Sequence, residues 1–362
     1  MWKILTLTGL CLMSCISAWA HGALWADNEQ LRQVNKVVIL PFEGPRRYYG
    51  GEAYLQDALS KRNKDTQFIL VADAQGNPQE IARRYGANAY VITYIRENDV
   101  RQDWSPDLKY SYNYRYYKEE TNGPHGTRRH DDHSYYTTQY FNGCNVAMQK
   151  VNMDFVMYNT NGNVIMTMQD RNYSYSNSEE SLTKDILKEM AISWRDAKKD
   201  AKSPISFSCE ITDVPSNVQE DSFLTNALDY TIEYESTNYK KIPSSDSYYV
   251  TAAVHNYSED WQWSAPYVST SMKEISSHSF KWKDHDGKEH TGYVHRYETV
   301  ADYVPGHYNV QGKVSATLNL VNSRTNQIVL SHTGTATHAK EIDSFREIVR
   351  DFYKKVAKQY SN

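Results

Sequence analysis

The chain has few cysteines, no long apolar segment beyond its first residues, and no concentration of charge of one sign. It contains four cysteines in 362 residues, and its formal net charge is −4, with acidic and basic residues interspersed. A mean hydropathy of −0.73 leaves no segment resembling a membrane span after the N-terminal region. Nucleic-acid binding favours a concentrated basic face, so this composition argues against a nucleic-acid partner.

Catalytic and cofactor motifs are also missing. The sequence has no Gly-x-Ser-x-Gly elbow, no phosphate-binding loop and no paired His/Cys signature, and Gly50-Gly51 lacks the spacing of a dinucleotide loop. We therefore expect a protein that is not an enzyme and needs no cofactor. A hydrolase whose site the sequence does not reveal is kept as an alternative.

The first twenty residues are typical of a secretory signal, which we assign to residues 1–20. Lys3 precedes an apolar run that ends in Ala18-Trp19-Ala20, a small-x-small pattern that predicts cleavage before His21. A competing interpretation is a lipobox at Leu12–Cys15, in which Cys15 would be the lipidated first residue of a lipoprotein. Both interpretations predict export, to the periplasm or the cell surface. The second adds a lipid anchor in the outer membrane.

Two cysteines remain after such processing, Cys144 and Cys209. An oxidising compartment permits a disulfide between them, but sequence alone does not show that their Cα atoms are close enough. The sequence therefore allows two alternatives, a Cys144–Cys209 disulfide or two isolated thiols.

The N-terminal part alternates strands and helices. Apolar strands are predicted at 37–42, 67–72 and 89–95, with helices between them at 52–62 and 78–85. Such βαβ connections imply a mainly parallel sheet with helices packed on it. A long hairpin at 145–175, turning at Asn159–Gly162, and an amphipathic helix around 182–194 follow, which makes the sheet mixed.

The C-terminal half repeats this plan. Lys150-Val151 through Asn159 aligns without gaps with Lys313-Val314 through Asn322, and each hairpin is followed by a helix. The fold predicted is α/β: two tandem, diverged modules at 27–203 and 204–362, the second without the helix equivalent to 78–85. Shared turn composition is the alternative explanation of the matching blocks.

Part of the first module resembles a known envelope superfamily. Val38–Phe42, the helix ending near Ala58-Leu59, Phe68–Asp73 and Gly86–Ile92 are similar to the core of curli-secretion-channel-type lipoproteins. The same core occurs in penicillin-binding-protein activator lipoproteins and in the amino-terminal domain of the Tol translocation protein B. The resemblance implies a non-catalytic module of the cell envelope that binds protein partners or forms homo-oligomers.

The chain holds thirty tyrosines, and many of them lie in a strand-rich excursion inserted into each module before its hairpin. Alternation places four rings on one strand face, and further rings pair back across a turn. The predicted binding residues are Tyr110, Tyr112, Tyr114, Tyr116, Tyr135, Tyr136, Tyr140 and Tyr267.

We expect these rings to contact an envelope protein, or alternatively a glycan or small ligand, because aromatic rings add contact area at little entropic cost. The competing interpretation is that the rings pack on the neighbouring copy or cover an edge strand. Histidines and aspartates at the tips, such as His130–His133 and His285-Asp286, are interpreted as solvated turns and not as a metal site.

Overall fold

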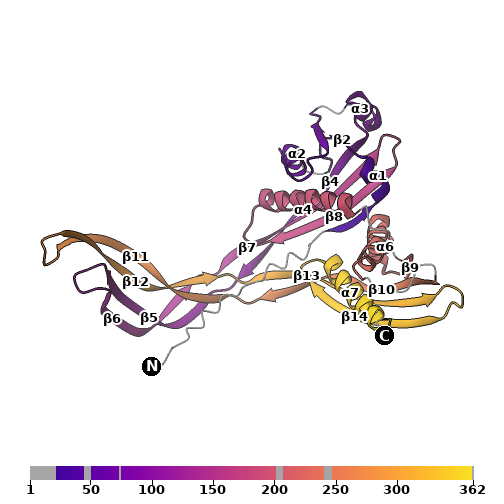
Figure 1. Ribbon diagram of the computed structural model, residues 1–362. Coiled ribbons are helices and arrows are strands. Elements are labelled where there is room, and N and C mark those ends of the chain that lie inside the picture. The colour runs from indigo at the N-terminus through magenta and orange to yellow at the C-terminus, as the bar shows by residue number, and fades with distance from the viewer. Residues whose placement is uncertain (1–21, 45–49, 73–74, 201–206, 240–246, 361–362) are drawn as a thin grey trace. The chain divides into compact units, whose positions relative to one another are not determined.

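A computed structural model describes the chain except residues 1–21, 45–49, 73–74, 201–206, 240–246 and 361–362 (Figure 1). The predicted signal sequence, Cys15 and most of the predicted linker at 198–204 therefore lie outside the described residues. Contacts divide the chain into two compact units. The first, which we call the α/β unit, consists of Met1–Asp99, Gln149–Trp261 and Val310–Asn362. The second, the β unit, consists of Val100–Met148 and Gln262–Asn309.

The first sheet of the α/β unit has six strands in the order β1-β8-β7-β4-β2-β3. Its parallel part, in which β2 pairs with both β3 and β4, is the predicted βαβ arrangement. The β7–β8 hairpin and the short β1 are antiparallel, which makes the sheet mixed. The strands are β1 (Ala23–Ala26), β2 (Lys36–Ile39), β3 (Gln67–Leu70), β4 (Ala89–Ser105), β7 (Cys144–Asn159) and β8 (Val164–Ser174).

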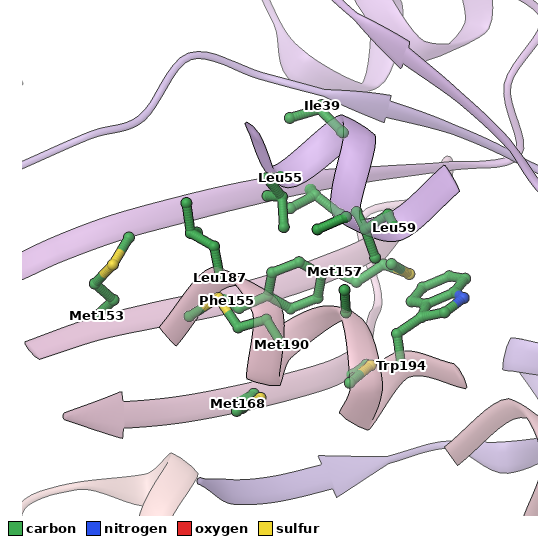
Figure 2. Packing of buried hydrophobic residues seen from close by; sticks show 14 of the residues in the cluster. Ile39, Leu55, Leu59, Met153, Phe155, Met157, Met168, Leu187, Met190 and Trp194 are labelled. Carbon is green, nitrogen blue, oxygen red and sulfur yellow. The ribbon is translucent and has the colours of Figure 1, made fainter. Parts of the chain in front are cut away.

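Helices cover both faces of this sheet. On one face α4 packs beside α2, and the ring of Trp194 lies edge-on to Phe68 at 5.9 Å between centroids. Figure 2 shows Leu55, Phe155 and Trp194 in this core, and all three side chains are fully buried. A smaller apolar cluster on the opposite face includes Ile81 of α3. The helices are α1 (Asn28–Gln33), α2 (Gly51–Arg62), α3 (Pro78–Arg84) and α4 (Glu179–Asp200).

The second sheet of the α/β unit has the order β14-β13-β10-β9, which matches β8-β7-β4-β2 strand for strand. β9 is parallel to β10, as β2 is to β4, and β13 and β14 form the second hairpin. Its elements are β9 (Cys209–Asp213), α5 (Ser216–Gln219), α6 (Ser222–Ser236), β10 (Tyr248–Ser264), β13 (His307–Asn322), β14 (Ile328–His338) and α7 (Glu341–Gln359). The α/β fold class is thus confirmed.

Both sheets have the strand order that the repeated sequence blocks require. The second module was expected to lack the helix equivalent to 78–85, and the described residues between α6 and β10 contain no α-helix. The module boundary at 203/204 and the duplication itself stay predictions. Contacts group the two sheets into one unit and set the four excursion strands apart.

The β unit is one four-stranded sheet in the order β11-β12-β5-β6. Its strands are β5 (Leu108–Thr121), β6 (Arg128–Phe141), β11 (Tyr267–Lys283) and β12 (Glu289–Val304). Each excursion is an antiparallel hairpin, and β12 pairs with β5, so the two excursions share a single sheet. The described residues of this unit include no helix, so none of its own elements covers either face of the sheet.

Among the described residues, no helix is both long and apolar enough to span a lipid bilayer.

Candidate interaction surface

Five predicted tyrosines share one face of the β unit, which we call the ladder face. Tyr110, Tyr112, Tyr114 and Tyr116 alternate along β5, and Tyr135 lies opposite Tyr114 on β6. The rings of Tyr110 and Tyr112 stack with centroids 6.2 Å apart, and those of Tyr114 and Tyr135 approach to 5.0 Å. The alternation predicted from the sequence therefore places a row of rings on one face, four of which form two contacting pairs.

The remaining predicted tyrosines are not part of this row. Tyr136 lies opposite Asn113 and Tyr140 opposite Lys109, which places both on the reverse face. Their exposed fractions, 82% and 70%, are higher than those of the other large apolar and aromatic side chains of the described residues. Adjacent strand residues point to opposite faces, so Tyr135 and Tyr136 cannot contribute to the same surface.

Tyr267 opens β11 and pairs with Val304 of β12, and 54% of its side chain is exposed. Among the described residues, no ring stacks on Tyr267 in the ladder face. The sequence grouped Tyr267 with the ladder, whereas the register puts it on the edge strand β11.

The reverse face contains a ring pair that sequence reasoning missed. Tyr117 of β5 stacks on Tyr297 of β12, with centroids 4.9 Å apart and planes 21° from parallel. The Arg115 guanidinium lies 5.3 Å from the Tyr117 ring centroid and donates two hydrogen bonds to the Asp132 carboxylate, of 2.9 and 2.6 Å. This pair therefore joins the first excursion to the second within one sheet.

Tyr117 follows the same alternation as the rest of β5. It lies on the face of Arg115, and its register with Tyr297 is regular, although the β5–β6 register shifts beside it. The signal available in the sequence was the adjacent pair Tyr116-Tyr117, which places a ring on each face of the strand.

The hydroxyl of Tyr114 stays protonated under physiological conditions. Desolvation, followed by a hydrogen bond to the Glu298 carboxylate, raises the pKa of Tyr114 to about 12. Desolvation and nearby glutamates likewise raise the pKa of Tyr297. These phenols are therefore hydrogen-bond donors and not anions.

The tip of the second excursion is an ordered polar turn. It reverses at Asp284–Lys288, as predicted, with Gly287 at φ 78°. The His290 imidazole stacks on Trp282 at 4.6 Å and lies 2.7 Å from the Asp284 carboxylate. This hydrogen bond is the main cause of the lowered pKa of Asp284. The described residues contain no group of three His, Cys, Asp or Glu side chains placed to hold a metal ion.

Cys144 and Cys209 are both free, so the disulfide considered from the sequence is not formed in this structure. Burial is the largest cause of the raised pKa of the Cys209 thiol, and the neighbouring Asp229 adds to it. Cys209 is therefore a structural thiol in β9 and not a reactive one.

Comparison with known proteins assigns no family. No family model matches the chain, and no curated protein matches it. Among solved structures, PelC from Paraburkholderia phytofirmans, a dodecamer, is 13% identical over 45% of this chain and 88% of its own, at a TM-score of 0.27. The lipoprotein GNA1162 from Neisseria meningitidis is 8% identical over 44% of this chain and 96% of its own, at a TM-score of 0.25.

Proposed function

We propose that this chain is a non-catalytic, exported protein of the bacterial cell envelope that binds another envelope component through the tyrosines of its β unit. The export signal predicted at residues 1–20 and the resemblance of the first module to envelope lipoproteins support the compartment.

The observation that carries the proposal is the exposure of aromatic rings on a sheet that no helix of its own unit covers. Tyr136 and Tyr140 leave most of their ring area in water on the reverse face, and the Lys109 ammonium lies 5.2 Å from the Tyr140 ring centroid. Apolar surface that stays exposed and grouped marks interaction sites more often than isolated exposed residues do. Tyrosine rings are rigid, so their burial against a partner costs little conformational entropy.

The test is photocrosslinking in intact cells, with a photoreactive phenylalanine at position 136. We expect one dominant crosslinked species, identified by mass spectrometry, and we expect Tyr140→Ser to reduce its yield several-fold. Tyr85→Ser is the matched control because Tyr85 is a 42% exposed tyrosine of the α/β unit. A diffuse set of products, or equal yields with Tyr140→Ser and Tyr85→Ser, would contradict the proposal. A crosslink to a second copy of this chain would show that the binding partner is the protein itself, in a homo-oligomer.

A further inference from the structure

β14 forms one edge of the second sheet, and no described strand pairs with its outer side. Along its 11 residues, Ile328–His338, backbone N–H and C=O groups therefore point outward in a row. In the first sheet, the outer side of the corresponding strand β8 accepts β1 in antiparallel pairing, and α4 lies over β8 as α7 lies over β14. This position of the fold thus accommodates one more strand with its helix in place.

Among the described residues, β14 is the one long edge strand without Asp, Glu, Lys or Arg. The edge strands of the β unit are charged: β6 contains Arg128 and Asp132, and β11 contains Lys273 and Glu274. β9, at the opposite edge of the second sheet, has only 5 residues. Charged side chains and short lengths prevent edge strands from pairing with other chains, and β14 has neither feature.

The side chains of β14 divide between its two faces. Gly334 packs against α7, and Ala336 is buried in the core. Thr333, Thr335 and Thr337 alternate with them, so they lie on the opposite face, and all three are exposed. Threonines that lie opposite each other on neighbouring antiparallel strands form favourable pairs, so this row suits pairing with a second copy of itself.

α7 carries a line of charges along the same edge. Glu347 pairs with His338, and the Lys355 ammonium lies 2.8 Å from Nδ1 of His332. Burial, followed by Lys355, lowers the pKa of His332, whereas Asp351 acts in the opposite direction, so Asp351 also lies beside this ring. Glu347, Asp351 and Lys355 recur at four-residue spacing and form one line, acidic toward the N-terminus of α7 and basic toward its C-terminus.

The sign of this line changes over the middle of β14. His332, beside which both Asp351 and Lys355 lie, is next to Thr333, the central residue of the strand. A two-fold axis at this point makes the two β14 strands antiparallel and places the acidic part of one α7 beside the basic part of the other. The exposed Lys354, 2.8 Å from Asp351, adds to the basic part. The edge is therefore complementary in charge to a second copy of itself.

We propose that β14 is a dimer interface, at which two copies of this chain pair their β14 strands antiparallel about a two-fold axis near Thr333. The two four-stranded sheets then form one continuous sheet. The inference does not rest on the partner proposed for the β unit, and Tyr136→Ser should leave the dimer intact.

Sedimentation velocity of the purified mature protein over a concentration series tests this with a charge swap. We expect the wild type to dimerise, and we expect Thr333→Lys and Thr333→Glu each to weaken dimerisation by about tenfold or more, because like charges meet at the axis. An equimolar mixture of the two variants should restore the dimer. His255→Lys is the control, since His255 is exposed on the same face but lies in β10, two strands from the edge.

Circular dichroism melts establish that the variants are folded, and Thr333→Cys gives an independent readout. Mild oxidation should link two copies of Thr333→Cys, whereas His255→Cys should remain unlinked. A wild type that stays monomeric up to about 100 µM would overturn the proposal. So would a dimer that persists in Thr333→Lys, or a mixture of the two charge variants that stays monomeric.

Discussion

Single residues of the β unit have distinct roles although most of them are tyrosines. Tyr117 and Tyr297 join the two excursions through one stacked pair, whereas Tyr136 and Tyr140 are exposed and contribute nothing comparable to folding. Stability and partner binding are therefore assigned to different tyrosines of the same sheet.

A double-mutant cycle measures the stacked pair. We expect Tyr117→Ala and Tyr297→Ala to be coupled by about 1 kcal/mol, as for other stacked aromatic pairs. Urea unfolding combined with hydrogen exchange of β5 and β12 gives the values. Tyr136→Ala is the control, with an expected change within about 0.5 kcal/mol. Strictly additive effects would show that the rings do not stabilise each other.

Asp229 makes stability depend on pH. Burial raises its pKa to about 6 in the folded state, against about 3.8 in the unfolded chain. Both states are protonated at low pH, and the unfolded chain loses its proton first, so folding stability falls as the pH rises from about 4 to about 6. We expect Asp229→Asn to remove this dependence. It should stabilise the protein at pH 7 by about 1 kcal/mol, a value discounted for the partial exposure of the group. Urea unfolding of the wild type and the variant at pH 4, 5, 6 and 7 measures it, and a stability difference between the two that stays constant across this range would contradict the assignment.

The start of the mature chain distinguishes the two processing interpretations. We expect intact-mass spectrometry of the exported protein to give a chain that begins at His21. A chain that begins at an acylated Cys15 would instead establish a lipoprotein, and Cys15→Ser would then release it from the membrane fraction.

At the scale of elements, α4 packs on the first sheet, and Trp194 is its largest fully buried side chain. Trp194 is fully buried and contacts Phe68, so its removal leaves a large void. We expect Trp194→Ala to lower the free energy of unfolding by about 3–5 kcal/mol. Thermal melts measure the loss, with Lys188→Ala on the exposed side of α4 as the control. A loss below about 1 kcal/mol would mean that the sheet does not depend on this contact.

Local patterns predicted most elements of the α/β unit correctly. The apolar strand 37–42, the helices at 52–62 and 78–85 and the hairpin turn at Asn159–Gly162 all appear, because periodicity and turn chemistry are local properties. The four-residue β1 and the five-residue β9 were missed.

The pairing of β5 with β12 could not be predicted. Alternation decides which face a side chain occupies, but it does not decide which strand lies alongside. Tyr117 and Tyr297 are 180 positions apart in the sequence, and nothing near either residue indicates the other. The predicted rings therefore lie on both faces of one sheet, and the role of that sheet as a binding surface stays a prediction.

The two sheets of the α/β unit differ in how their edges end. In the first sheet, β1 pairs with the outer edge of β8. The strand that corresponds to β8 in the second sheet is β14, and β14 is itself an edge strand. β14 also carries no Lys, Arg, Asp, Glu or Pro, the residues that usually protect such an edge.

At the scale of the whole chain, four strands belong to both units. β4, β7, β10 and β13 each begin in one unit and continue into the other without a break.

This continuity restricts how the protein can change in evolution. An insertion of one residue in a continuous strand turns every following side chain of that strand to the opposite face. Within β5, therefore, only even-numbered insertions preserve the row that includes Tyr112 and Tyr114. A change in one strand also needs a matching change in the strand hydrogen-bonded to it. Relatives of this protein should therefore differ in the length of the strands of their β units by two residues at a time, with the same change in both strands of a hydrogen-bonded pair.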